Sequence, residues 1–138
     1  MICRPAIVLI WFHFLEAARR AGVRKVVYSS SAGIFGELKT LYIREDHPVE
    51  PDSPYGASKL AAEKLGLVYA KLYSLEVVCL RYFNVYGVNQ RYDAYGNAMP
   101  IFAYRMLNDL PAIIFEDGEQ TRDFVNVRDV AQANYKAA

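Results

Sequence analysis

The sequence predicts an α/β fold in which helices alternate with the strands of a parallel sheet. Three observations carry this prediction: a helix-forming stretch over residues 7–21, a short apolar run over residues 25–30, and a second helix and strand over residues 54–73 and 77–81. Short strand-like runs separated by long helical stretches are typical of parallel sheets with right-handed crossover connections.

Both predicted helices carry signals at their ends. Basic residues stand in the last turn of the first helix and Gly22 follows them, which is typical of a helix C-terminus. Ser53 or Asp52 can cap the second helix, and Pro54 suits its first turn. Apolar residues recur at helical spacing along the second helix and predict a buried stripe formed by Ala61, Leu65, Val68 and Leu72.

After Gly87 the sequence becomes polar and rich in turn residues, which predicts a different part of the fold. The elements expected there are a helix over residues 99–108, strands over residues 112–115 and 123–126 around a turn at Gly118, and a last helix from Asp129.

The composition limits the class of protein. With 138 residues, 54% of them hydrophobic and 22% charged, the chain can form the core of an ordinary globular protein. The net charge of +1 gives no reason to expect nucleic acid or an acidic membrane as a partner. Cys3 and Cys79 have no neighbour at metal-ligand spacing, so we expect no metal, a small buried thiol at Cys79, and the reducing cytoplasm as the compartment.

The uncharged run over residues 5–15 allows a second interpretation, a short signal peptide. The run is too short to cross a membrane. It also continues through a well-ended helix into the strand at residues 25–30, as an α/β unit should. We therefore expect no membrane segment.

Tyr55 and Lys59 carry the most specific chemical signal. Four residues apart at the start of a predicted helix, they lie on one face, a turn apart. A nearby positive charge lowers the pKa of a phenol, whose ordinary value is about 10. With Ser31 at the end of the preceding strand to hold a substrate hydroxyl, the set is suited to moving a proton to and from a secondary alcohol. The alternative is an amphipathic helix with an incidental tyrosine.

The motifs together resemble the extended short-chain dehydrogenase/reductase family, especially the NAD-dependent epimerases that act on nucleotide sugars. The segments that carry the resemblance are Lys25-Val26-Val27-Tyr28-Ser29-Ser30-Ser31, Gly33-Ile34-Phe35-Gly36, Pro54-Tyr55-Gly56-Ala57-Ser58-Lys59, Arg81-Tyr82-Phe83-Asn84-Val85-Tyr86-Gly87 and Gly118-Glu119-Gln120-Thr121-Arg122-Asp123-Phe124-Val125. The resemblance implies a Rossmann-type, doubly wound parallel sheet, of which this chain holds a part, followed by the start of a small substrate-binding lobe.

The resemblance also implies roles for individual residues. Ser31, Tyr55 and Lys59 would be catalytic, and the cofactor NAD would contact Ser29, Tyr55, Lys59 and Phe83. The nucleotide sugar would contact Ser31, Asn84, Asn97, Met99 and Arg122. A planar guanidinium such as that of Arg122 suits a diphosphate because it donates two parallel hydrogen bonds.

Each assignment has a structural alternative. Ser31 can simply satisfy turn amides, Lys59 can be a solvated helix residue, and Asn84 can be a turn residue. Arg122 can form a surface ion pair with Asp123. His13 and His47 are expected to be ordinary helix and loop residues rather than ligands.

The domain organisation follows from the same resemblance. We expect residues 1–87 to be the C-terminal half of an NAD-binding domain and residues 88–138 to be part of the substrate lobe. No Gly-rich turn follows an N-terminal strand, so we expect an interior portion of a longer family fold. The intact family fold is expected to be a homodimer.

The favoured function is epimerisation of a nucleotide-diphosphate sugar through a transient keto-sugar, with Tyr55 as the acid and base. A related dehydratase would need carboxylates next to Ser31 for acid/base elimination, whereas the sequence has Ala32-Gly33 there. A related decarboxylase is expected to have a Glu in this stretch. A dehydratase or reductase therefore ranks lower. The other alternative is a truncated, non-catalytic chain that needs a partner or is inactive.

Overall fold

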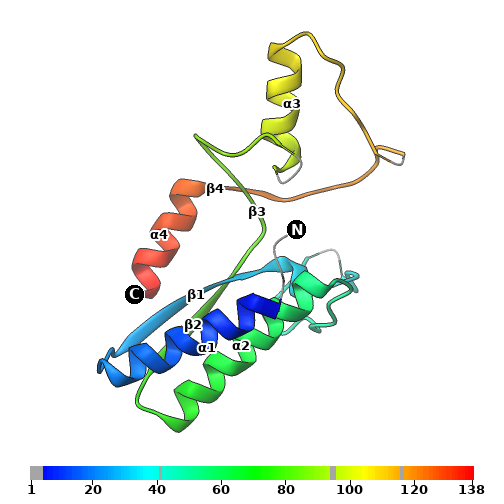
Figure 1. The fold of residues 1–138 in the computed structure, drawn as a ribbon. Helices are drawn as coiled ribbons and strands as arrows, with labels where there is room; N and C mark the ends of the chain where they lie inside the picture. The colour runs from blue at the N-terminus through cyan, green and yellow to red at the C-terminus, as the bar shows by residue number, and fades with distance from the viewer. Residues whose placement is uncertain (1–4, 41, 94–95, 116) are drawn as a thin grey trace. The chain divides into compact units, whose positions relative to one another are not determined.

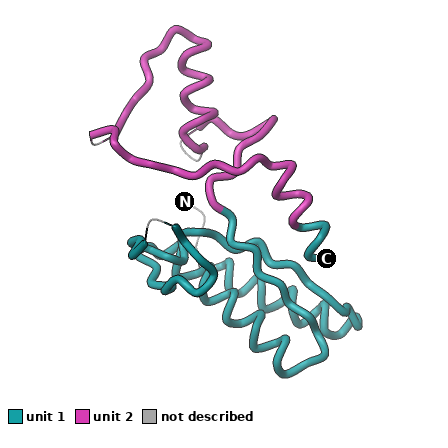
Figure 2. The backbone as a smooth tube through the Cα atoms, turned by 180° about the vertical axis from the view of Figure 1, so that it is seen from behind, with its two compact units in different colours: residues 1–82, 134–138 teal, residues 83–133 magenta. Residues whose placement is uncertain are grey.

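The computed structural model of the chain describes residues 5–40, 42–93, 96–115 and 117–138. They divide into two compact units, each described by itself below (Figure 2). Unit 1 comprises Met1–Tyr82 with Asn134–Ala138, and unit 2 comprises Phe83–Ala133. Cys3 lies outside the described residues. The functional boundary expected after residue 87 stays a prediction.

Unit 1 has the predicted order of helices and strands. Its elements are α1 (Pro5–Arg20), β1 (Lys25–Ser31), the short 3-10 helix η1 (Ala32–Ile34), α2 (Pro54–Leu72) and β2 (Glu76–Tyr82). β1 and β2 pair in parallel, from Lys25 opposite Glu76 to Ser31 opposite Tyr82. Figure 1 shows α1 and α2 side by side over one face of these strands. The parallel α/β fold expected from the sequence is confirmed.

The core of unit 1 lies between the two helices and the strands. Alternate residues of β1 are buried, at Val26, Tyr28 and Ser30, as expected for a strand that packs one face against helices. Trp11 of α1 packs its ring against Tyr28 at a centroid distance of 4.4 Å. Its indole Nε1 donates a 2.9 Å hydrogen bond to the carbonyl oxygen of Ala62 on α2, so the two helices are joined inside the core.

The helix ends match the sequence signals. Gly22 has a positive φ of 69°, and the amide of Val23 donates a 3.0 Å hydrogen bond back to the carbonyl oxygen of Ala18. This is the reversed turn for which glycine is favoured at a helix C-terminus. At the other helix, Ser53 is the N-cap, and its Oγ accepts a 3.1 Å hydrogen bond from the amide of Gly56.

The predicted buried stripe of α2 was wrong by one position. Leu72 is 65% exposed, whereas the buried residues of the helix include Ala62, Gly66 and Tyr69. The cause is a close approach, because a Cβ on Gly66 would lie 3.0 Å from Cγ1 of Val77. A residue without a side chain is therefore needed at this contact, and the predicted stripe lies outside the buried face or at its edge, at Ala61, Leu65, Val68 and Leu72.

Unit 2 contains a second pair of parallel strands. Its elements are β3 (Asn84–Tyr86), α3 (Ala98–Leu107), β4 (Phe124–Asn126) and the start of α4 (Val127–Ala137). β3 pairs with β4 with Asn84 opposite Phe124 and Tyr86 opposite Asn126. The sequence prediction ended the preceding strand at residue 81 and gave no strand over β3.

The strand predicted over residues 112–115 was wrong. This segment has no regular structure, and Ile114 and Phe115 are 64% and 75% exposed. A strand needs a hydrogen-bonded neighbour, and β4, the only described strand after α3, pairs with β3 instead. The turn at Gly118 is present, with a φ of 80°. Among the described residues no helix is long and apolar enough to cross a membrane.

Candidate active site

Ser31 and Tyr55 border one small space at the carboxyl end of β1. Ser31 ends the strand and caps η1, and its Oγ accepts a 3.2 Å hydrogen bond from the amide of Gly33. α2 begins at Pro54 and therefore carries Tyr55 in its first turn. A Cβ on Gly33 would lie 3.5 Å from Ser31 Oγ and 3.6 Å from Tyr55 Cδ1. The structure thus brings together the hydroxyl and the phenol that the sequence paired.

Lys59 is held beside Tyr55 by the backbone of β1. Its Nζ donates a 2.7 Å hydrogen bond to the carbonyl oxygen of Ser29 and lies 5.8 Å from the centroid of the Tyr55 ring. Burial lowers the pKa of Lys59 from its ordinary value. The lysine is thus a fixed, half-buried cation rather than a solvated helix residue.

A second tyrosine, Tyr28, lies slightly closer to this cation than Tyr55 does. The Lys59 ammonium is 5.2 Å from the centroid of the Tyr28 ring. Tyr28 is buried, however, and burial, followed by the neighbouring Tyr55, raises its pKa to about 12. Tyr55 is 38% exposed. Of the two phenols next to Lys59, Tyr55 is therefore the one that a substrate in solution can reach.

In unit 2, Asn84 and Arg122 lie at the same end of the β3–β4 pair. Nδ2 of Asn84 donates a 2.9 Å hydrogen bond to the carbonyl oxygen of Asp123, the residue after Arg122. The exposed Arg122 donates from Nη1 to the carbonyl oxygen of Thr121 at 3.4 Å. In the described part of the chain no ion pair joins Arg122 to Asp123. The guanidinium is therefore open to solvent and to ligands.

The remaining predicted contacts are also placed within unit 2. Asn97 precedes α3, and its Nδ2 donates a 3.1 Å hydrogen bond to the carbonyl oxygen of Val85 in β3. Met99 follows in the first turn of α3 and is 40% exposed. Phe83 is 37% exposed, and its carbonyl oxygen accepts a 3.0 Å hydrogen bond from the amide of Val85. Asn97 is thus tied to β3, while Phe83 and Met99 present apolar surface.

Sequence reasoning missed an ion pair directly beneath the site. Glu63, four residues after Lys59, has a side chain that is only 2% exposed and binds Arg81 near the end of β2. The signal was available: Tyr55, Lys59 and Glu63 recur every four residues, the spacing of one helix face. Arg81 likewise ends an otherwise apolar strand.

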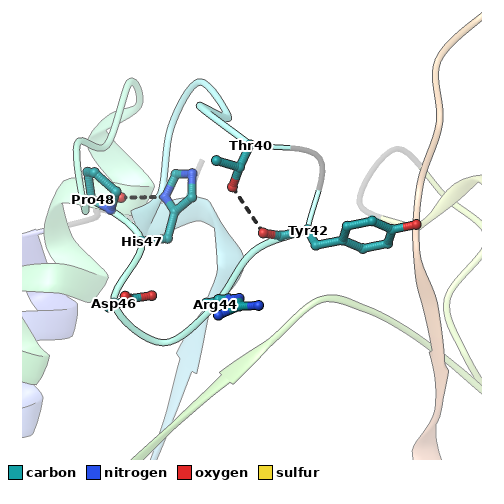
Figure 3. A pocket seen from close by; sticks show the side chains of 6 residues that line it. All are labelled: Thr40, Tyr42, Arg44, Asp46, His47 and Pro48. Carbon is teal, nitrogen blue, oxygen red and sulfur yellow. Dashed lines mark hydrogen bonds between the residues drawn. The ribbon is translucent and has the colours of Figure 1, made fainter.

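The loop between η1 and α2 encloses a separate cavity of about 470 Å³. Figure 3 shows the side chains that line it, namely Thr40, Tyr42, Arg44, Asp46, His47 and Pro48. Both ring nitrogens of His47 are used by the loop itself: Nδ1 lies 2.8 Å from the carbonyl oxygen of Pro48, and Nε2 accepts a 3.2 Å hydrogen bond from the amide of Lys39. His47 therefore stabilises the loop. Among the described residues no cluster of His, Cys, Asp and Glu is arranged to hold a metal.

Parallel strands with a helical crossover, and polar side chains gathered at their carboxyl edge, are typical of a Rossmann-type domain. The chain belongs to the NAD dependent epimerase/dehydratase family, whose sequence model matches residues 7–138. This family uses NAD as its cofactor, and its members are enzymes.

Similar proteins agree with this membership. The chain is 44% identical over 131 residues to a putative UDP-glucose 4-epimerase of Methanocaldococcus jannaschii, covering 94% of this chain and 43% of that protein. The crystal structure of UDP-glucose 4-epimerase from Thermotoga maritima with UDP-glucose is 35% identical, with a TM-score of 0.92 over 96% of this chain and 43% of that one.

A third relative was solved with both ligands. The UDP-glucuronic acid 4-epimerase of Bacillus cereus, in complex with UDP-glucuronic acid and NAD, is 37% identical, with a TM-score of 0.87 over 95% of this chain and 40% of that one. Nucleotide-sugar dehydratases also occur among the similar proteins. The chain spans about two fifths of the length of the relatives it matches.

Proposed function

We propose that the protein carrying this chain is an NAD-dependent epimerase of a nucleoside-diphosphate sugar, of the UDP-glucose 4-epimerase kind, with Tyr55 as its acid and base. The observation that carries the proposal is the placement of Ser31 and Tyr55 on either side of Gly33, with the Lys59 ammonium 5.8 Å from the Tyr55 ring centroid. The names of the similar proteins, mostly UDP-sugar 4-epimerases, support the substrate class.

Each side chain has a distinct task in this reaction. Ser31 Oγ accepts a hydrogen bond from Gly33, so its own proton is available to hold the oxygen of the reacting sugar hydroxyl. Tyr55 takes the proton from that hydroxyl as the sugar is oxidised and returns it after the keto-sugar has turned over. The Lys59 ammonium places a positive charge beside the Tyr55 ring. NAD, when bound, supplies the acceptor and donor of the hydride.

The residues at the site fit the nicotinamide end of NAD. An ammonium has three N–H donors, and among the described residues Lys59 uses one of them, toward Ser29. The other two are free to hold ribose hydroxyls. Ser29 is exposed beside Lys59, and the partly exposed Phe83 is proposed to border the nicotinamide with its backbone.

The diphosphate and the nucleoside are assigned to unit 2. Asn84 and Arg122 lie at one end of the β3–β4 pair and offer hydrogen-bond donors, which a diphosphate requires. Asn97 and Met99 are proposed to line the nucleoside side.

Replacement of Tyr55 tests the function. The assay uses a chimera in which residues 7–138 replace the matching segment of the Methanocaldococcus jannaschii relative. With NAD and UDP-glucose, Tyr55→Phe should lower turnover by about 10²-fold or more, the scale of a lost general acid and base. The matched control is Tyr135→Phe, since Tyr135 is 84% exposed on α4. Near-normal turnover in Tyr55→Phe would refute the assignment.

A dehydratase ranks below an epimerase as the proposed function because no carboxylate lies at the position that contacts both Ser31 and Tyr55 in space. That position is Gly33, preceded by Ala32, so neither supplies the carboxylate that elimination would use. In the same assay, formation of a dehydrated keto-sugar instead of the 4-epimer would reverse this ranking.

The remaining alternative is that the 138-residue chain by itself has no catalytic activity. Its contacts for NAD reach the nicotinamide end, and its sequence has no Gly-rich turn after an N-terminal strand for the pyrophosphate. We expect the isolated chain to bind NAD weakly. Calorimetry that found micromolar binding, together with turnover, would contradict this expectation.

We also propose a homodimer that forms through α1 and α2. Both helices pack one face on unit 1 and expose large apolar side chains on another, including Ile10 at 67% and Leu72 at 65%. Exposed apolar patches on paired helices are typical of protein contact surfaces. The reducing cytoplasm stays the predicted compartment.

A further inference from the structure

The side chains of Glu63 and Arg81 form a two-bond ion pair behind the site. Arg81 Nε donates to Glu63 Oε1 at 3.1 Å, and Arg81 Nη2 donates to Glu63 Oε2 at 3.0 Å. The Glu63 side chain is only 2% exposed and that of Arg81 is 27% exposed. The carboxylate also raises the pKa of Arg81. Such a fork fixes both the distance and the orientation of its partners.

The same guanidinium reaches two further segments. Its Nη1 donates to the carbonyl oxygen of Glu45 at 3.5 Å, in the loop that leads to α2. Its central carbon lies 5.3 Å from the centroid of the Phe35 ring, and Phe35 is the C-cap of η1. Arg81 therefore contacts α2, the loop before it and η1 from one position on β2.

These segments are the ones that carry the proposed chemistry. Glu63 lies on α2 one turn after Lys59 and two turns after Tyr55. Arg81 stands opposite Ser30 in the β1–β2 register, next to Ser31. A shift or rotation of α2 against the strands would change the Tyr55–Ser31 spacing, and the fork opposes both movements.

Stability alone gives a poor account of this pair. Replacing a buried ion pair by apolar residues of similar volume is often neutral or stabilising, whereas a two-bond fork supplies directional constraint that apolar packing lacks. We infer that Glu63 and Arg81 are positioning residues, which set α2 against β1 and η1 so that Tyr55 and Ser31 meet one sugar hydroxyl. This inference rests on the proposed function for its catalytic consequence.

The first test replaces the fork with a single-point cation. In the chimera, Arg81→Lys keeps the charge but loses the two-bond geometry. We expect kcat to fall on the order of 10²-fold, the scale of a misplacement by about 1 Å, while KM for the nucleotide sugar stays unchanged. The matched control is Glu76→Gln, at the opposite end of the same two strands. It removes the ion pair between Lys25 Nζ and Glu76 Oε2, which are 3.4 Å apart, and should leave kcat unchanged.

A second variant separates positioning from folding. The double substitution Glu63→Leu/Arg81→Met replaces the pair with apolar side chains, and we expect it to keep its melting temperature but to lose kcat as Arg81→Lys does. A double variant as active as the unsubstituted chimera would overturn the inference, because apolar packing would then position Tyr55 equally well.

A structural readout makes the result independent of turnover. In the 138-residue chain, the space beside Gly33 predicts a nuclear Overhauser effect between its α-protons and the Tyr55 ring. We expect Arg81→Lys to weaken it strongly and Glu76→Gln to retain it. If the unsubstituted chimera has no turnover, the proposed function fails, and this signal alone decides the inference. An effect of equal strength in Arg81→Lys would overturn it.

Discussion

Gly56, in the first turn of α2, stands directly against the carbonyl oxygen of Gly33, at a spot where any Cβ on Gly56 would collide with that oxygen. The helix that carries Tyr55 and Lys59 therefore touches the turn after β1 backbone to backbone. This contact requires the glycine that follows Tyr55 and sets how closely the phenol approaches Ser31.

Gly56→Ala should damage both the fold and the site. Although alanine favours a helix more than glycine does, the collision forces backbone to move, so we expect a net loss of about 1–3 kcal/mol in the free energy of unfolding, the range for overpacking. Denaturant unfolding measures the loss, and turnover of the chimera should fall as well. Ala57→Ser, at the next and exposed position, is the control. Unchanged stability and turnover in Gly56→Ala would show that the contact is not tight.

Arg122→Ala should weaken nucleotide binding. If the exposed guanidinium binds the diphosphate, its removal costs about 1.5–3 kcal/mol, the range for hydrogen bonds to charged groups. Titration calorimetry of the chimera with UDP measures the change. Arg128→Ala removes another exposed arginine, from the start of α4, and should have little effect. Equal UDP affinity in both variants would place the diphosphate clamp elsewhere.

The proposed dimer surface predicts that charge will separate the subunits. Ile10→Glu on α1 and Leu72→Glu on α2 would each bury a carboxylate in the interface, so the dimer dissociation constant should rise on the order of tenfold or more. Sedimentation of the chimera gives the oligomeric state. Leu107→Glu, at an 85% exposed position of α3, is the control. A dimer that persists in all three variants would contradict the use of this surface.

The folded stability of unit 1 should depend on the ionisation of Glu16 at acidic pH. Hydrogen bonds from Arg19 and Arg20 lower the pKa of Glu16 to about 2, and Tyr69 on α2 donates to it at 3.2 Å. Because this pKa is depressed in the folded state, the carboxylate contributes stability above the ordinary pKa of about 4.3. That contribution is lost as the pH falls toward 2.

Unfolding monitored by circular dichroism tests this dependence. The difference in stability between the unsubstituted chain and Glu16→Gln should be present at pH 6 and should shrink between about pH 4.5 and 2. Glu37→Gln, in the exposed loop after η1, should show no such change. A difference that stays constant across this range would mean that Glu16 does not titrate as the structure indicates.

The sequence predicted those features that depend on local patterns. The strand at residues 25–30, the glycine after α1 and the cap at Ser53 depend on local backbone preferences, and all were confirmed. The juxtaposition of Ser31 with Tyr55 was also found, because parallel strands and their helices bring loop ends to one edge.

Features that depend on partners in space were not predicted correctly. The apolar side chains of α2 suggested a stripe that faces the core, but the close contact at Gly66 turned the small residues inward. Residues 112–115 have the composition of a strand but no described strand beside them. Glu63 escaped notice because a charged residue on a helix is normally solvated, and only the distant Arg81 explains its burial.

The packing of Trp11 has a practical consequence for spectroscopy. It is the single tryptophan of the chain, it is only 8% exposed, and its indole is hydrogen-bonded to α2 and packs at a tilt against the Tyr28 ring. Its fluorescence therefore senses whether α1 is docked on the helix that carries Tyr55. Unit 2 contains no tryptophan, so a shift of the emission toward that of a water-exposed indole would report undocking within unit 1. The chain thus contains an intrinsic optical probe of the packing in unit 1.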